Sequence, residues 1–164
     1  KFQVEKEIWG GSQERNRRAG TENLQGILGL GTAMEEAYEN MERIEAMEEE
    51  IHEYLERRLK NEIEDIKING EKSPRLKTIT NLCLKGCDIQ TLLIALDLRG
   101  ICVSGGSACM SGAHEDSHVL KEMGLNSEEL KSSFRISIGK DTTIEEIDYF
   151  IDNLKEIAKI ERGI

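Results

Sequence analysis

The sequence predicts an α+β fold, in which helices pack on a small mixed or antiparallel sheet. Three observations predict this fold class. A helical period of apolar residues extends from about Thr21 to Ile63. Short runs rich in β-branched residues then alternate with helical segments, and residues 134–138 alternate between apolar and polar side chains like a half-buried strand. We therefore expect a long helix followed by a compact α+β region.

The first element is a long helix, because apolar side chains recur mostly three or four positions apart over residues 21–63. They are Ile27, Leu30, Met34, Ala37, Met41, Ile44, Met47, Ile51, Leu55 and Leu59. Thr21 is the expected N-cap. Gly26, Gly29 and Gly31 each weaken the helix by roughly 1 kcal/mol relative to alanine unless close packing compensates. Such a helix either kinks or joins two domains. A coiled-coil dimer is the alternative, which the glycines and incomplete heptads disfavour.

Short elements follow. Residues 66–69 and 79–84 predict two strands, and residues 101–103 predict a third. Between the second and third strands, Asp88 is the expected N-cap of an amphipathic helix that ends at Gly100.

The last part of the chain contains two short helices, a strand and a terminal helix. Residues 117–123 and 127–131 predict the two helices, and residues 134–138 predict the strand. Residues 142–145, Thr-Thr-Ile-Glu, indicate a capping box that opens the terminal helix. The apolar stripe of that helix consists of Ile147, Ile151, Leu154 and Ala158.

Composition excludes several classes of partner. The 164 residues fit one domain, or one domain plus a fragment of another. A formal net charge of −10 argues against nucleic acid or an anionic membrane as the main partner, since both require a basic face. No apolar run approaches the roughly 20 residues that span a bilayer. No signal-peptide pattern is present either, so we expect a cytoplasmic protein.

The four cysteines do not resemble the disulfide framework of a small secreted domain. The chain contains the residue types of a Cys₂His₂ zinc site, namely Cys83, Cys87, His114 and His118. Zinc ligands, however, usually occupy a small, turn-rich domain. Cys83 lies inside a predicted strand and Cys87 opens a predicted helix, so we expect no metal site.

Cys109 stands in a loop of small residues, Ser104 to Gly112, directly after the apolar residues 101–103. Glycine relaxes the backbone, so such a loop can move as a unit. A structural cysteine is normally buried and inert. The position suits a catalytic nucleophile on a mobile loop. The alternative is a linker that carries a free cysteine.

Two further residues suggest binding of anions. Arg135 lies on the polar face of the predicted strand, where a half-buried guanidinium needs an anionic partner. An internal salt bridge is the alternative. Thr21, at a helix start, can offer its hydroxyl and nearby amides to a phosphate, or can serve simply as an N-cap. The cluster of residues 14–18, with three arginines, is on its own a solvated face.

Together these segments resemble a known family. Residues 10–23, GGSQERNRRAGTEN, resemble a motif of the pyridoxal-phosphate-dependent cysteine desulfurases of the NifS/IscS type, in the class V aminotransferase family. Residues 92–112, LLIALDLRGICVSGGSACMSG, resemble that family's helix, strand and active-cysteine loop. Residues 134–139, FRISIG, resemble its C-terminal strand. The similarity covers essentially the whole chain, in the order and spacing of the family.

The resemblance implies roles for three residues. Cys109 matches the cysteine that takes sulfur from the substrate L-cysteine as a persulfide while alanine leaves. Arg135 matches the arginine that binds the substrate's α-carboxylate. Thr21 matches the threonine that contacts the phosphate of the pyridoxal phosphate held by the other subunit of a homodimer. The long loop places the chain with the branch that feeds an iron–sulfur scaffold or another sulfur-acceptor protein.

The resemblance also implies a fragment, because no part of the chain matches the family's Schiff-base lysine motif. We expect the C-terminal small domain of a fold-type-I transferase plus a long linking helix. Residues 1–35 then form the end of the large cofactor-binding domain and the start of that helix, and residues 36–164 form the small domain. Alone, this chain is expected to bind no cofactor covalently and to be inactive.

Two other functions stay open at this point. The first is a non-catalytic sulfur-carrier or interaction module, in which Cys109 accepts persulfide from a separate enzyme. The second is a different cysteine enzyme. A phosphatase loop needs an arginine six positions after the cysteine, where this chain has Glu115. A thiol protease needs a basic histidine, for which His114 and His118 are the nearest candidates.

Overall fold

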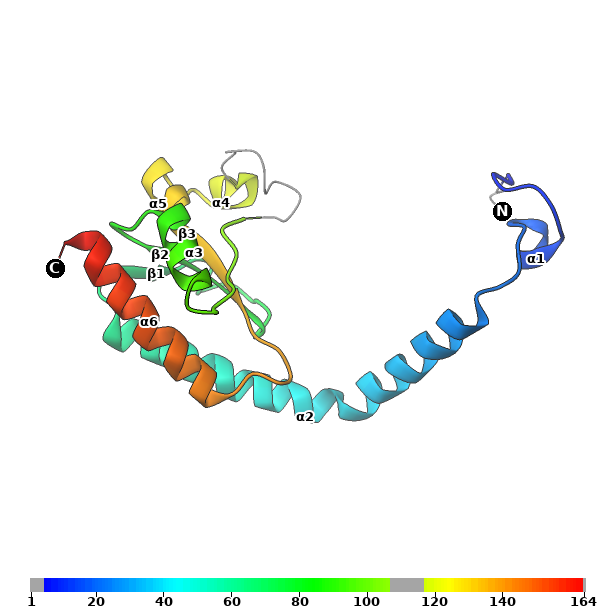
Figure 1. Cartoon of the computed structure of the whole chain (residues 1–164), viewed down its shortest axis with the longest axis horizontal. Coiled ribbons are helices and arrows are strands. Elements are labelled where there is room, and N and C mark those ends of the chain that lie inside the picture. The colour runs from blue at the N-terminus through cyan, green and yellow to red at the C-terminus, as the bar shows by residue number, and fades with distance from the viewer. Residues whose placement is uncertain (1–4, 107–116, 164) are drawn as a thin grey trace. The chain divides into compact units, whose positions relative to one another are not determined.

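The computed structural model describes residues 5–106 and 117–163, and the chain forms two compact units, residues 1–42 and 43–164. The long helix α2 (Leu24–Glu62) contributes to both units (Figure 1). This confirms the long predicted helix to within three residues at its start and one at its end. The expected boundary after residue 35 also falls inside α2. Its assignment to the parts of a larger protein stays a prediction.

The N-terminal unit contains α1 (Gln13–Asn16) and the first part of α2. The N-cap prediction for Thr21 is wrong. Asn23 directly precedes the first helical residue, and its Oδ1 accepts a hydrogen bond from the Gly26 N–H at 3.0 Å. Thr21 lies too far before the helix to make that bond. Apolar side chains of this part of α2 are exposed, namely Leu24, Ile27, Leu28, Leu30, Met34, Tyr38 and Met41.

The second part of α2 packs in the C-terminal unit beside α6 (Ile144–Arg162). Leu55 and Leu59 of α2 are buried in the same core as Ile151 of α6. None of the described helices is long and apolar enough to cross a membrane.

The capping box of α6 lies one residue later than predicted. Thr143 is the N-cap, and its side chain and that of Glu146 exchange bonds with each other's backbone N–H groups. Thr142 is engaged elsewhere, because its hydroxyl accepts a bond from the Gly139 N–H at 3.0 Å in the preceding turn. Two threonines in succession offer the same cap chemistry, and the turn decides between them.

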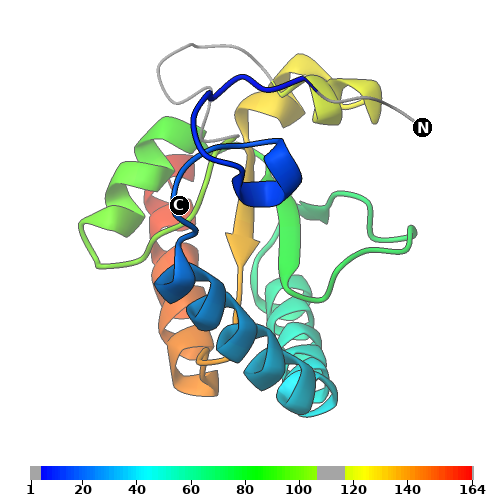
Figure 2. The ribbon, with the colours of Figure 1, turned by 90° about the vertical axis from the view of Figure 1, so that its right-hand side faces the viewer.

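The sheet has three antiparallel strands in the order β1-β2-β3. They are β1 (Ile66–Ile68), β2 (Ile79–Leu84) and β3 (Ser133–Ser137). The central strand β2 places Leu82 opposite Phe134 of β3, and Figure 2 shows these two strands side by side. The sequence predicts a mixed or an antiparallel sheet, and the structure has the antiparallel form.

The predicted strand at residues 101–103 is wrong. Its first N–H, of Ile101, donates back to the Leu96 carbonyl at 3.0 Å, which closes the end of α3 (Ile89–Asp97). Ile101 and Val103 pack against the core. This packing explains why they are apolar although they form no strand. Within the described part of the segment, only Ser104 pairs with the sheet.

Helices pack on one face of the sheet and lie near part of the other face. The core face, with Leu82 and Phe134, packs against the second part of α2, against α6 and against α3. Asp88 caps α3 as predicted, since its carboxylate accepts from the N–H groups of residues 90 and 91. The short helices α4 (His118–Glu122) and α5 (Ser127–Lys131) also form as predicted. Lys67 of β1 reaches Glu129 of α5 at 2.7 Å, which places α5 near the other face.

A polar cluster joins α2 to α6 at the edge of the core. Arg58 of α2 is bonded to Glu62 one turn later and to Asp148 of α6. Tyr54 Oη also donates to Asp148 Oδ1 at 2.5 Å. Partly exposed ion pairs of this kind contribute up to about 1 kcal/mol. The apolar contacts between the two helices therefore contribute most of the stability.

The two parts of α2 predict responses of different size to a leucine-to-alanine substitution. Leu55 is 1% exposed and Leu30 is 62% exposed. Leu55→Ala should lower the free energy of unfolding of this chain by about 2–5 kcal/mol, because it leaves a cavity in the core. Leu30→Ala should change it by less than about 0.5 kcal/mol. Urea unfolding followed by circular dichroism measures both, and equal losses would contradict the described packing.

Candidate functional site

Arg135 lies in the middle of β3, between two residues that are buried in the core. Because side chains alternate along a strand, Phe134 and Ile136 face the helices and Arg135 faces the other way. The structure corrects the expectation of a half-buried arginine, since this side chain is exposed. No carboxylate of the described residues lies within ion-pair distance of it. Among the residues that the structure describes, the internal salt bridge is therefore not found, and their carboxylates leave the guanidinium open to an external anion.

Four polar residues form a row across the sheet. Ser104 and Arg135 exchange two backbone hydrogen bonds, of 3.1 and 2.7 Å. Arg135 lies opposite Asn81 of β2. The backbone N–H of Asn69, just after β1, donates to the Asn81 carbonyl at 2.8 Å. Sequence analysis missed both asparagines. The alternation of Asn81 with buried neighbours was the available signal, but its use requires the strand register.

The predicted nucleophile Cys109 lies outside the described residues. The described chain reaches Gly106, where the Ser104 hydroxyl donates to the Gly106 carbonyl at 2.7 Å. Ser104 is the first residue of the small-residue segment singled out in the sequence. The structure therefore fixes the start of that segment beside Arg135.

The other three cysteines differ in exposure. Cys83 and Cys87 are buried and Cys102 is exposed. Burial raises the pKa of the Cys83 and Cys87 thiols, so both form less of the reactive thiolate. Cys102 lines a hollow of about 460 Å³ between residues 100–103, the end of β3 and the start of α6. Among the described residues no group of three His, Cys, Asp or Glu side chains could hold a metal ion.

Thr21 lies in the N-terminal unit, apart in the chain from Arg135, and its side chain is exposed. No hydrogen bond to its hydroxyl is formed by the residues that the structure describes. The preceding turn is held by Gln13, whose Oε1 accepts from the Gly20 N–H at 3.3 Å. An open hydroxyl and the exposed Arg15 and Arg17 are groups that suit a phosphate. These exposed groups can contact an anion such as a phosphate.

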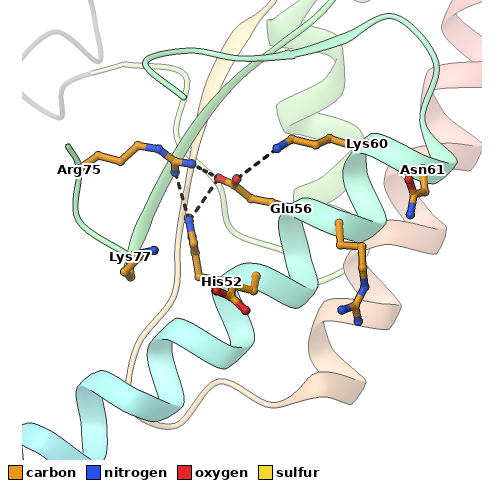
Figure 3. Close-up of a pocket in the computed structure, with 8 residues that line it drawn as sticks. His52, Glu56, Lys60, Asn61, Arg75 and Lys77 are labelled. Atoms are coloured by element: carbon orange, nitrogen blue, oxygen red, sulfur yellow. Dashed lines mark hydrogen bonds and ion pairs between the residues drawn. The ribbon is translucent and has the colours of Figure 1, made fainter. Parts of the chain in front are cut away.

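A polar hollow that the sequence did not reveal has a volume of about 420 Å³. Figure 3 shows the side chains that line it. His52 and Glu56, one turn apart on α2, are 4% and 8% exposed. Arg75, from the β1–β2 connection, lies 3.2 Å from His52 Nε2 and 2.6 Å from Glu56 Oε1. His52 Nε2 also lies 3.3 Å from Glu56 Oε1, so Arg75, His52 and Glu56 contact one another. His52 Nδ1 faces Thr80 Oγ1 at 3.4 Å.

The charges around this hollow are largely paired with one another. Lys60 lies 3.6 Å from Glu56, and Lys77 lies 3.2 Å from Glu49. Burial lowers the pKa of His52 most, Glu56 opposes this shift, and Arg75 adds to it. A neutral buried histidine in a paired cluster holds the β1–β2 connection on α2. We assign the hollow a structural role.

The arrangement defines an α+β domain in which an exposed arginine lies beside the start of a cysteine-bearing segment. Residues 2–150 match the family model described as aminotransferase class-V. The chain belongs to the aminotransferase class-V family.

Similar proteins are cysteine desulfurases by name. The chain is 42% identical over 155 residues to a cysteine desulfurase of Trichormus azollae, covering 94% of this chain and 39% of the relative. It is 43% identical over 157 residues to a cysteine desulfurase IscS of Clostridium botulinum strain Hall, covering 94% and 40%. The solved structure of a NifS-like protein from Rickettsia africae matches with a TM-score of 0.79 and 36% identity, over 95% of this chain and 40% of that one.

These comparisons confirm the resemblance and the fold class. The chain spans about two fifths of the length of the curated relatives that it matches. The activity, substrates and partners of a whole protein are therefore matters for proposal.

The buried His52 predicts a pH-dependent stability. Its pKa is lower in the folded chain than the ordinary value of 6.5, so the unfolded state binds the proton first as the pH falls. The free energy of unfolding should drop between pH 7.5 and 5.5, by no more than about 1.4 kcal/mol per pH unit from this group. His52→Gln should reduce that drop. The exposed His118→Gln is the control, and an equal drop in all three proteins would contradict the assignment.

Proposed function

We propose that this chain is part of a cysteine desulfurase that converts L-cysteine to L-alanine and holds the sulfur as a persulfide on Cys109. The observation that carries the proposal is the pairing of Ser104 with Arg135. This pairing ties an open guanidinium to the first residue of the segment that bears Cys109. The names of the relatives support the same activity.

Arg135 binds the α-carboxylate of L-cysteine in this proposal. The guanidinium fork matches a carboxylate in a bidentate manner, and no described carboxylate competes for it. The backbone N–H and carbonyl of Arg135 both bond to Ser104, while β3 pairs with β2 along its other side. A rigid strand therefore orients the substrate relative to the cysteine segment.

Cys109 accepts the substrate sulfur. The Cys109 thiolate attacks the sulfur of L-cysteine, an S–S bond forms, and the substrate C–S bond breaks. Carbon is reduced and gains a proton, while the two sulfur atoms become the persulfide. L-cysteine and one thiol thus give L-alanine and one persulfide, with no external oxidant or reductant. Small residues around Cys109 suit a sulfur atom that must next reach an acceptor.

Pyridoxal phosphate, when bound, supplies the electron sink that this cleavage requires. From this chain, Thr21 would contact its phosphate, and the open hydroxyl fits that role. The lysine that holds the cofactor is proposed to lie elsewhere in the longer protein.

The proposal includes the partners that the resemblance implies. The cofactor phosphate that Thr21 contacts is that of the second subunit of a homodimer. The persulfide sulfur passes to an iron–sulfur scaffold or another acceptor protein in the cytoplasm. The alternative, a non-catalytic sulfur carrier, predicts that Cys109 acquires sulfur only when a separate desulfurase is supplied.

Replacing Cys109 separates substrate binding from sulfur transfer. In the longer, cofactor-loaded protein, Cys109→Ser should keep L-cysteine binding but abolish alanine release. A serine hydroxyl is far less nucleophilic than a thiolate and cannot hold a transferable sulfur. Alanine release after addition of L-cysteine measures the effect, with Cys102→Ser as the control at an exposed cysteine. Alanine formation at the normal rate by Cys109→Ser would refute the assigned role.

Replacing Arg135 tests carboxylate binding. Arg135→Ala should raise the KM for L-cysteine by about 10- to 100-fold, since a charge-assisted bidentate contact contributes about 1.5–3 kcal/mol. The melting temperature should stay close to that of the wild type, because the side chain is exposed. Arg57→Ala, at an exposed arginine of α2, is the control. An unchanged KM with a large loss of melting temperature would show that Arg135 has a structural role instead.

A further inference from the structure

We propose that Asn81 is a second donor for the substrate carboxylate, beside Arg135. This inference rests on the proposed function, in which Arg135 binds the α-carboxylate of L-cysteine. It follows from the direction of the hydrogen bonds that fix the Asn81 amide.

The chain of hydrogen bonds begins at Ser133 of β3. Its hydroxyl lies 2.6 Å from the Glu129 carbonyl oxygen. A carbonyl oxygen has no proton, so Ser133 must donate its only hydroxyl proton to it. The Ser133 oxygen can then only accept a bond from any other neighbour. That neighbour is the side-chain amide of Asn69, at 3.2 Å.

The Asn69 amide therefore turns its nitrogen toward Ser133. The same Nδ2 donates to Asn81 Oδ1 at 2.7 Å. Asn69 is 5% exposed, and rotation of its amide would break both bonds. The buried Asn69 thus fixes which end of the Asn81 amide faces it, namely the acceptor end.

The donor end of Asn81 is the end that remains open. Asn81 is half-buried, and none of the described residues accepts a bond from its Nδ2. Asn69 follows β1, so Asn81 Oδ1 is engaged on the β1 side of the central strand. Arg135 lies directly opposite Asn81 on β3. Opposed residues on one face of an antiparallel pair have Cβ atoms about 4.5–5.5 Å apart.

This geometry suits a carboxylate. An ionised carboxylate has about four lone-pair positions, of which a bidentate guanidinium takes two. A neutral amide donor beside Arg135 can take another without adding a charge that repels the guanidinium. An acidic side chain at position 81 would instead neutralise Arg135 and repel the substrate.

Two variants of the longer, cofactor-loaded protein test the inference. Asn81→Ala should raise the KM for L-cysteine about tenfold, as expected for the loss of one hydrogen bond to a charged group. Asn81→Asp should raise the KM further, because its carboxylate competes for Arg135. Asn81→Asp keeps an acceptor for the buried Asn69, so it carries the test if Asn81→Ala fails to fold. Asn61→Ala, at an exposed asparagine of α2, is the matched control.

A second readout separates carboxylate recognition from a structural role. Cysteamine, which lacks the carboxylate, should inhibit the wild type and both variants with the same inhibition constant, while kcat changes less than KM. A folded Asn81→Asp protein with an unchanged KM, or an equal loss of cysteamine inhibition, would overturn the role of Asn81 alone. A wild-type protein that neither binds nor converts L-cysteine would overturn the proposed function and this inference together.

Discussion

The antiparallel register between β2 and β3 determines which side chains surround Arg135. That register places Asn81 opposite the arginine and sends Phe134 into the core. A slip of one residue would turn every side chain of β3 to the other face, which would bury the guanidinium and expose the phenylalanine. The apolar packing of Phe134 and Leu82 therefore holds the polar row in place as firmly as it holds the sheet. Stability and site geometry depend on the same contacts.

Much of this fold could be predicted from local patterns. The period of α2, the Asp88 cap and the alternation around Arg135 each depend on neighbouring residues only, and each is confirmed. The errors arose where tertiary contacts choose between equivalent local signals. Thr142 is held by the preceding turn, so Thr143 caps α6. Residues 101–103 are apolar because they cover the core, and they form no strand.

The site could be predicted only in part, for a related reason. The chemical character of Arg135 is visible in the sequence, but Asn69 and Asn81 acquire meaning only when three strands are brought together. The period of α2 is equally misleading about burial, because its apolar residues recur in both parts while only the second part is buried. Periodicity predicts that a helix has an apolar face. It does not predict which part of that face is buried against the rest of the protein.

The central claim is that sulfur leaves L-cysteine for Cys109, and following the sulfur atom tests it most directly. The longer, cofactor-loaded protein would be incubated with L-cysteine carrying isotopically labelled sulfur, digested without reductant and analysed by peptide mass spectrometry. The account predicts labelled persulfide on the peptide that contains Cys109, and none on the buried Cys83 and Cys87 or the exposed Cys102. Labelled persulfide on Cys102, or alanine formed without label on Cys109, would contradict it.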